Sequence, residues 1–236
     1  MARHAVLFDL DDTIYDHRFA SRRALAWLRE HQDSLRSVPL GALEEEYEVQ
    51  MNALHPLVLA GQFTPQQART ERLRRIFADH GERITGAEAK RRSKGYRAAY
   101  LRSERAVPGV RAVVRRLARR GHPLGVVTNN SVVDQRRKLE VCGVAPYLRT
   151  MVISQAVGLQ KPDPRIFRIA LDRLGVEPSE TTMVGDSYSS DVVGARSAGI
   201  TPVWLNRRGL RPPRNDGVRQ LTSYLPLEDA VRALLE

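Results

Sequence analysis

The chain has 236 residues, of which 42% are hydrophobic and 28% charged, the composition of an ordinary globular protein. Its length fits one large domain or a core with a smaller inserted unit. Cys142 is the single cysteine, which excludes an internal disulfide. No apolar stretch approaches the roughly 18 residues of a membrane helix, and the short apolar run after Met1 does not resemble a signal peptide. We therefore expect a cytoplasmic protein with no membrane segment.

The formal net charge is +11 and the sequence pI about 10.4, a balance that favours anionic ligands. The excess positive charge comes from arginines scattered along the chain, many of them beside Asp or Glu. A solvated, arginine-rich surface explains this scatter better than a nucleic-acid-binding face does. We therefore expect a small anionic partner rather than nucleic acid.

Five apolar runs predict buried strands, and the first covers residues 5–8. Residues 16–105 follow it with four helical patterns and no strand pattern. Two helix starts are marked in this segment: Thr64-Pro65-Gln66-Gln67 offers an N-cap and a capping glutamine, and Thr85 with Glu88 forms a second capping box. Residues 16–105 are therefore predicted to be an all-helical insert.

The other four apolar runs lie at residues 124–128, 150–154, 181–185 and 200–205. Helical patterns separate them, the clearest of which follow Pro108 and span residues 164–174. Buried strands that alternate with helices pair in parallel through crossover connections. The predicted fold class is α/β, with a parallel sheet built from residues 1–15 and 106–236.

Polar side chains follow four of the predicted strands, at the edge where ligands bind in open α/β sheets. Acids follow the first and fourth strands, a hydroxyl and amides follow the second, and a lysine follows the third. In chain order these residues are Asp9, Asp11, Thr128, Asn129, Lys161, Asp186 and Asp191. Their convergence predicts one site, although each would be a weak signal alone.

The acids have the chemistry of phosphoryl transfer. Asp9 and Asp186 can hold a hard cation such as Mg²⁺ through oxygen. Asp9 can attack phosphorus and form an aspartyl-phosphate. Asp11, two residues further on, is suited to act as general acid for the leaving oxygen and then as general base for water.

The remaining polar residues are candidates for substrate binding and support. Thr128, Asn129 and Lys161 can hold phosphoryl oxygens, where charge lies in the transition state. Asp191 can hold Lys161 or a water molecule at the metal. Simpler interpretations stay open: Thr128 or Asn129 could cap the following helix, and Asp191 could be a first-turn helix acid.

The order and spacing of these residues resemble the four motifs of the haloacid dehalogenase superfamily. The matching elements are Asp9-Leu10-Asp11-Asp12-Thr13, Thr128 after a strand, Lys161 before a proline, and Gly185-Asp186 with Asp191. The resemblance implies a Rossmann-like catalytic core (1–15 and 106–236) and a subfamily I helical cap (16–105) that closes over the substrate. It also implies that the backbone carbonyl of Asp11 is a metal ligand.

Asp11 indicates which chemistry of this superfamily to expect. Members that remove halide lack the second acid of the first motif, because halide leaves without a proton. Its presence favours a Mg²⁺-dependent phosphomonoester hydrolase acting on a small phosphorylated metabolite, such as a phosphosugar, a nucleoside monophosphate or flavin mononucleotide. Two alternatives remain: a phosphotransferase or mutase that uses the same intermediate, and a basic nucleic-acid-binding protein with a vestigial site. The sequence defines neither the particular metabolite nor an oligomeric state.

Overall fold

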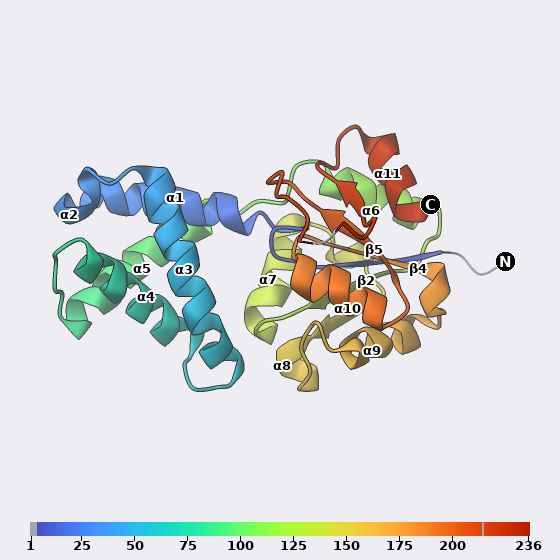
Figure 1. Cartoon of the computed structure of the whole chain (residues 1–236), viewed down its shortest axis with the longest axis horizontal. Coiled ribbons are helices and arrows are strands. Elements are labelled where there is room, and N and C mark those ends of the chain that lie inside the picture. Colours follow the sequence, from blue (N-terminus) through green and yellow to red (C-terminus); the bar gives the residue numbers. More distant parts are fainter. Residues whose placement is uncertain (1–3, 214) are drawn as a thin grey trace. The chain divides into compact units, whose positions relative to one another are not determined.

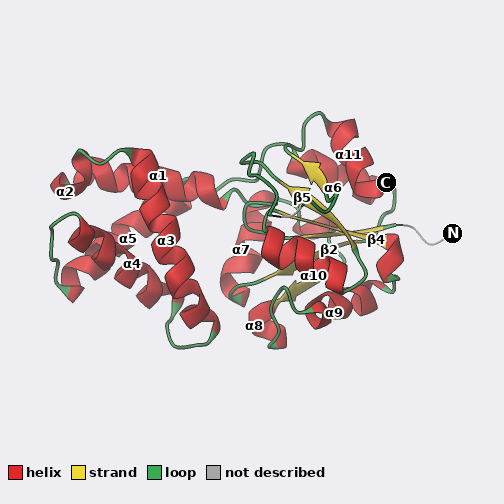
Figure 2. Ribbon diagram, in the orientation of Figure 1, coloured by secondary structure: helices red, strands yellow, loops and turns green. Residues whose placement is uncertain are grey.

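The computed structural model describes residues 4–213 and 215–236. The chain divides into two compact units, one formed by Met1–Asp16 with Arg105–Glu236 and the other by His17–Glu104. The described strands all belong to the first unit, whereas the second is built from helices alone (Figure 2). A helical unit is thus inserted into an α/β unit directly after the first strand.

A six-stranded parallel sheet in the order β3-β2-β1-β4-β5-β6 forms the centre of the first unit. Residues of β1, β2 and β4 are buried throughout, as expected for parallel strands covered on both faces, and so their sequences are continuous apolar runs. The predicted fold class, α/β with a Rossmann-like parallel sheet and an all-helical insert, is confirmed. The strands are β1 (Ala5–Phe8), β2 (Leu124–Thr128), β3 (Thr150–Ile153), β4 (Thr181–Gly185), β5 (Thr201–Leu205) and β6 (Arg219–Leu221).

The strand order locates the site. The chain runs outward from β1 through β2 to β3 on one side, and from β4 through β5 to β6 on the other. Ligands in such sheets bind outside the carboxyl ends of the strands at the point where the order switches. That point lies between β1 and β4, which are paired from Ala5↔Thr181 to Phe8↔Val184.

Helices cover both faces of this sheet. Figure 1 shows α6 (Val110–Arg119) and α11 (Leu227–Leu235) on one face, and α9 (Pro164–Leu174) and α10 (Val193–Ser197) on the other. Phe167 of α9 belongs to the same cluster of buried core residues as Leu7 of β1 and Val127 of β2. Two further helices, α7 (Val132–Cys142) and α8 (Ser154–Val157), follow β2 and β3.

The helical unit contains four long helices and one short turn of helix. They are α1 (His17–His31), α2 (Asp33–Arg36), α3 (Leu40–Leu59), α4 (Pro65–Asp79) and α5 (Gly86–Arg102). Both predicted capping boxes are present, Thr64 with Gln67 and Thr85 with Glu88. The unit's core includes a stack of buried tyrosines, in which the ring centroids of Tyr47 and Tyr96 are 5.3 Å apart. Among the described helices of either unit, none has both the length and the apolar character to cross a membrane.

Candidate active site

Asp9 lies at the carboxyl end of β1 and continues the β1–β4 ladder, because its backbone N–H donates to the Val184 carbonyl at 2.9 Å. The chain then turns sharply, with the N–H groups of Ile14 and Tyr15 both donating to the Leu10 carbonyl. Asp12 adopts a left-handed conformation in this turn (φ 60°), which Asp tolerates better than most residues. The turn keeps the carboxylates of Asp9 and Asp11 at the same edge of the sheet.

Lys161 links two of the predicted acids. Its buried Nζ lies 2.6 Å from an oxygen of Asp9 and 2.6 Å from an oxygen of Asp191. Asn129 holds the backbone of this lysine from both sides: its Oδ1 accepts from the Lys161 N–H at 2.8 Å, and its Nδ2 donates to the Lys161 carbonyl at 3.0 Å. The Asn129 side chain thus fixes Lys161, a role that the sequence did not suggest.

Asp186 and Asp191 are positioned by the turn that follows β4. Trp204 Nε1 donates to the Asp186 carbonyl at 2.8 Å, and one π-helical turn, η3 (Tyr188–Val192), brings Asp191 back toward the strand. The N–H of Ser187 donates to the second oxygen of Asp191 at 3.0 Å. Gly185 must lack a side chain here, because a Cβ atom at that position would overlap the Asp191 carboxylate.

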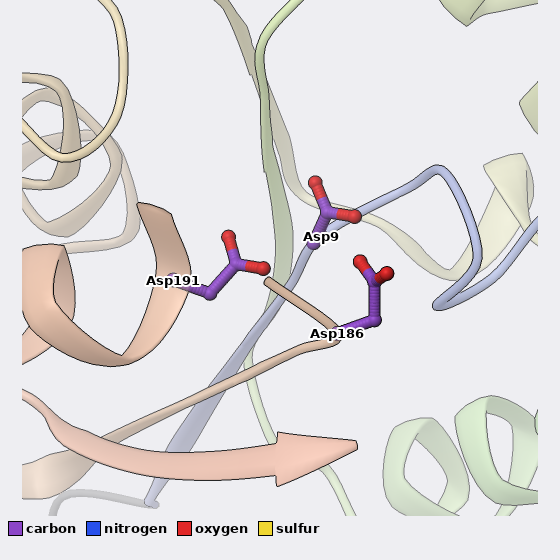
Figure 3. A group of neighbouring side chains, drawn as sticks. All are labelled: Asp9, Asp186 and Asp191. Atoms are coloured by element: carbon purple, nitrogen blue, oxygen red, sulfur yellow. The ribbon is translucent and has the colours of Figure 1, made fainter. Parts of the chain in front are cut away.

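Three carboxylates therefore converge from two strand ends (Figure 3). One oxygen each from Asp9, Asp186 and Asp191 lie within 4.8 Å of one another. Burial raises the pKa of Asp9 to about 7, an effect that Lys161 opposes and the Asp191 carboxylate reinforces. Burial also raises the pKa of Asp186 well above its ordinary value, with further contributions from Asp12 and Asp9.

Lys161 balances only part of this negative charge. Burial alone would lower the pKa of its ammonium, but Asp191 and Asp9 raise it on balance, so the lysine stays charged. Three carboxylates face this single ammonium, so negative charge is in excess at the cluster when the acids are ionised. A site with this excess of oxygen ligands and negative charge fits a hard divalent cation.

Asp11 is held by a helix that the sequence analysis did not connect with the site. The Nζ of Lys138 in α7 lies 2.6 and 2.8 Å from the two oxygens of Asp11. Gln135, one turn earlier, donates through Nε2 to Asp11 at 3.2 Å and to the Thr128 hydroxyl at 2.7 Å. Both α7 residues are buried. Gln135 and Lys138 share one face of α7 with Leu139 and Cys142, and this spacing could have indicated that they are buried. Polar residues at these positions are, however, also typical of an exposed helix face.

All seven predicted site residues lie in the sheet unit. They form two groups, and contacts connect the members within each group. Lys161 and Asn129 join the group that contains Asp9, Asp186 and Asp191. Gln135 joins Asp11 to Thr128, which ends β2 beside β1. The arrangement offers a buried carboxylate, a second carboxylate two residues away, an ammonium and a group of acids that could hold a cation, and these groups suit phosphoryl transfer.

Comparison with known proteins gives the same class. A sequence model of the haloacid dehalogenase-like hydrolases matches residues 4–199. The chain therefore belongs to the haloacid dehalogenase-like hydrolase family. The predicted family and enzyme type, a hydrolase of the phosphatase type within this superfamily, are confirmed by this match together with the relatives that follow.

Two relatives and one solved structure illustrate the similarity. A glyceraldehyde 3-phosphate phosphatase of Methanopyrus kandleri is 32% identical over 238 aligned positions, covering 98% of this chain and 97% of the relative. A phosphoserine phosphatase of Thermus thermophilus is 41% identical over 141 residues, which span 58% of this chain and only 55% of that protein. The structure of the HAD-hydrolase YfnB from Bacillus subtilis matches with a TM-score of 0.75 over 98% of this chain and 99% of that one, and at 23% identity this shows a shared fold.

Proposed function

We propose that this hydrolase cleaves a small phosphomonoester through an aspartyl-phosphate on Asp9, with Mg²⁺ as its cofactor. The observation that carries the proposal is the placement of the buried Asp9 carboxylate, 2.6 Å from the Lys161 ammonium and beside Asp186. Asp11 lies two residues away and is held in place by α7. The names of the relatives support phosphate esters as the substrate class.

Asp9 and Asp186, with the backbone carbonyl of Asp11, are the proposed ligands of Mg²⁺. The grouping of three carboxylates around one ammonium supports a cation there. When bound, the cation would offset the repulsion between the carboxylates and the substrate phosphate. Asp191 is better suited to hold Lys161 than to bind metal, because its two oxygens already accept hydrogen bonds from Lys161 and the Ser187 N–H.

The reaction follows from the positions of the two acids. An oxygen of Asp9 attacks phosphorus, the ester P–O bond breaks, and the leaving oxygen takes a proton from the carboxyl group of Asp11. Asp11, now a carboxylate, accepts a proton from the water that attacks the aspartyl-phosphate. The bond between phosphorus and Asp9 then breaks, which releases inorganic phosphate and restores the Asp9 carboxylate. Thr128 and Lys161 hold the phosphoryl oxygens, and Asn129 acts by fixing Lys161.

The helical unit His17–Glu104 is proposed to be the cap of subfamily I members, with substrate recognition as its task. Such a cap would favour small metabolites over polymer ends, because a covered site limits access. Phosphoserine and glyceraldehyde 3-phosphate, the compounds named for two relatives, are accordingly the first to test. Phosphosugars, nucleoside monophosphates and flavin mononucleotide complete the panel.

The testing experiment measures phosphate release from this panel with Mg²⁺ and with EDTA, for the wild type and for Asp9→Asn. We expect release that requires Mg²⁺ and falls at least about 10³-fold in Asp9→Asn, since the variant keeps the shape and loses the nucleophile. Asp172→Asn, the same change at an exposed acid of α9, is the matched control and should retain full activity. Substantial release by Asp9→Asn would overturn the assignment, and transfer of phosphate to another compound in place of release would make the enzyme a phosphotransferase.

A further inference from the structure

We propose that Lys138 and Gln135 of α7 are positioning residues, which hold the Asp11 carboxylate in the orientation that proton transfer requires. The inference rests on the proposed function, because it gives Asp11 the role of general acid and base. Neither α7 residue belongs to the motifs that carry the family resemblance. The buried contacts made by these two side chains carry the inference.

The Lys138 ammonium engages both oxygens of Asp11, at 2.6 and 2.8 Å. In the carboxylate state a contact to both oxygens fixes the rotation of the group as well as its position. When Asp11 is protonated, one oxygen still accepts from Lys138 while the other carries the proton for the leaving oxygen. The lysine is itself 5% exposed, and its Nζ lies 5.2 Å from the centre of the Tyr15 ring, so the cation is packed in place. A buried ammonium is costly without an acidic partner, and Asp11 supplies that partner.

Gln135 adds the second fixed contact. Its Nε2 donates to Asp11 at 3.2 Å and to the Thr128 hydroxyl at 2.7 Å, and the side chain is fully buried. One amide thus ties the proposed proton donor to a proposed phosphate ligand on the neighbouring strand. The separation between the ester oxygen and the phosphoryl oxygens is fixed by the substrate, so a fixed spacing between Asp11 and Thr128 is what the reaction needs.

The competing interpretation is that α7 only anchors the turn after β1. The Cys142 thiol, which donates to the Ile14 carbonyl at 3.6 Å, is a contact of that kind. An anchor would affect all substrates alike. A positioning role would affect most strongly those substrates whose leaving group needs a proton.

The experiment therefore compares two aryl esters, phenyl phosphate and p-nitrophenyl phosphate, for which kcat/KM reports the steps through release of the phenol. p-Nitrophenol is a far better leaving group than phenol and needs little help from a general acid. In Lys138→Met we expect kcat/KM for phenyl phosphate to fall about 10–100-fold, and that for p-nitrophenyl phosphate to fall less than about 3-fold. Gln135→Met should show the same selectivity with a smaller loss, and Lys138→Arg should recover part of the phenyl phosphate activity.

Arg136→Met is the matched control, since it removes a cation from the exposed side of the same helix and should change neither substrate. A cycle with Asp11→Asn tests whether Lys138 acts through Asp11: adding Lys138→Met to that variant should change kcat/KM for phenyl phosphate less than 2-fold. Equal losses for both esters, or an undiminished effect of Lys138→Met without Asp11, would overturn the proposal. Turnover that does not depend on Asp9 would instead overturn the proposed function.

The ion pair can also be measured without any substrate. If Lys138 and Asp11 are paired in solution, Lys138→Met should lower the urea midpoint of the wild type and raise it in Asp11→Asn, where the buried ammonium has lost its partner. Equal effects in the two backgrounds would show that the pair is absent and would also overturn the proposal.

Discussion

At the scale of single residues, Lys161 is the group on which the charge balance of the site depends. Its ammonium lies 2.6 Å from Asp9 and from Asp191, and all three side chains are buried. A buried lysine between two acids is stable only as part of the trio, because each carboxylate would otherwise be left without its countercharge. The lysine therefore contributes to folding as well as to the proposed binding of phosphate.

Lys161→Met should consequently affect two properties. Phosphate release should fall about 10²–10³-fold, as it does when a donor to the transition state is lost. The free energy of unfolding in EDTA at pH 8 should fall by about 3–5 kcal/mol, the cost of breaking a buried ion pair. Urea unfolding and phosphate release measure the two effects separately.

A second substitution tests whether Lys161 is coupled to Asp9 and Asp191 or acts alone. Adding Asp191→Asn to Lys161→Met removes one of the two carboxylates left without a partner, and should recover part of the lost stability but none of the activity. A Lys161→Met protein as stable as the wild type would contradict the coupling of the three charges.

At the scale of elements, the connection between β4 and η3 is a part of the site that should not tolerate a larger residue. Gly185 ends the strand, and a Cβ atom there would occupy the place of the Asp191 carboxylate. Asp191 in turn holds both Lys161 and the N–H of Ser187. Gly185 therefore determines the position of Lys161 indirectly. Its missing side chain leaves room for Asp191, and Asp191 holds Lys161.

Gly185→Ala should displace Asp191 and loosen Lys161, with a loss of activity of at least about 10-fold and a loss of stability of about 1–3 kcal/mol. Gly41→Ala is the matched control, because beyond its chain neighbours and its own helix backbone no atom lies within 4 Å of the Cβ position, and the residue is in the first turn of α3. Alanine favours a helix over glycine, so the control should be neutral or slightly stabilising. Thermal unfolding and phosphate release compare the two, and similar behaviour would refute the steric argument.

The elements also show what could be predicted from sequence. The strands of the sheet centre were predictable because burial on both faces leaves continuous apolar runs such as Ala5–Phe8 and Thr181–Gly185. The edge strand β6 was missed, since Arg219–Leu221 is short and has no apolar run. The four-residue α2 was also missed, because it is too short to show a periodic pattern.

The site followed the same rule. Residues placed directly after strand ends, such as Asp9 and Asp186, could be predicted to converge because parallel strands end at the same edge of a sheet. The position of Lys138 could not be predicted, because it lies ten positions after Thr128 and well inside a helix, and its side chain resembles that of any exposed helical lysine. The use of the Asn129 amide for the Lys161 backbone was hidden for a related reason, as it depends on a contact 32 residues away. The assignment of roles to these residues remains a prediction.

At the scale of the whole molecule, much of the positive charge is paired on the surface. Arg74 and Arg75 both contact Glu71, Arg116 and Arg120 both contact Glu228, and other arginines pair with acids of their own unit. This pattern supports the interpretation of the +11 charge as a solvated arginine-rich surface. The buried acids Asp9 and Asp186 differ from these surface groups, because their pKa values are raised toward neutral pH or beyond.

Those acids predict how stability depends on pH without metal. The pKa of Asp9 is about 7 in the folded protein against an ordinary value of 3.8, because burial disfavours its charge. Between these values the folded state retains a proton that the unfolded state has lost, so this group makes the protein less stable as pH rises from about 4 to 7. Burial also raises the pKa of Asp186, so this group too makes the protein less stable as pH rises.

Other groups do not reverse this trend in the site. Glu71 and Asp216, whose pKa values are lowered to about 2 by their arginine partners, add stability as pH rises toward their ordinary values of 4.5 and 3.8, so their effect is confined to the lower end of the window. His4 acts in the opposite direction, since burial lowers its pKa and its neutral form is favoured in the fold. It precedes β1 at the amino end of the sheet, away from the acids, so its contribution should be equal with and without Mg²⁺.

The difference in Tm between Mg²⁺ and EDTA therefore isolates the site. The cation needs the carboxylates deprotonated, so protons compete with it at low pH and binding is strongest above pH 7. At pH 8 and a Mg²⁺ concentration about 100 times its Kd, we expect a stabilisation of about 2.7 kcal/mol, or roughly 5–10 °C in Tm. At pH 5.5 and the same concentration the shift should be less than half as large. Asp186→Asn should be more stable than the wild type in EDTA at pH 8 and should lose most of the Mg²⁺ shift, whereas equal shifts at both pH values would contradict the placement of the cation at these acids.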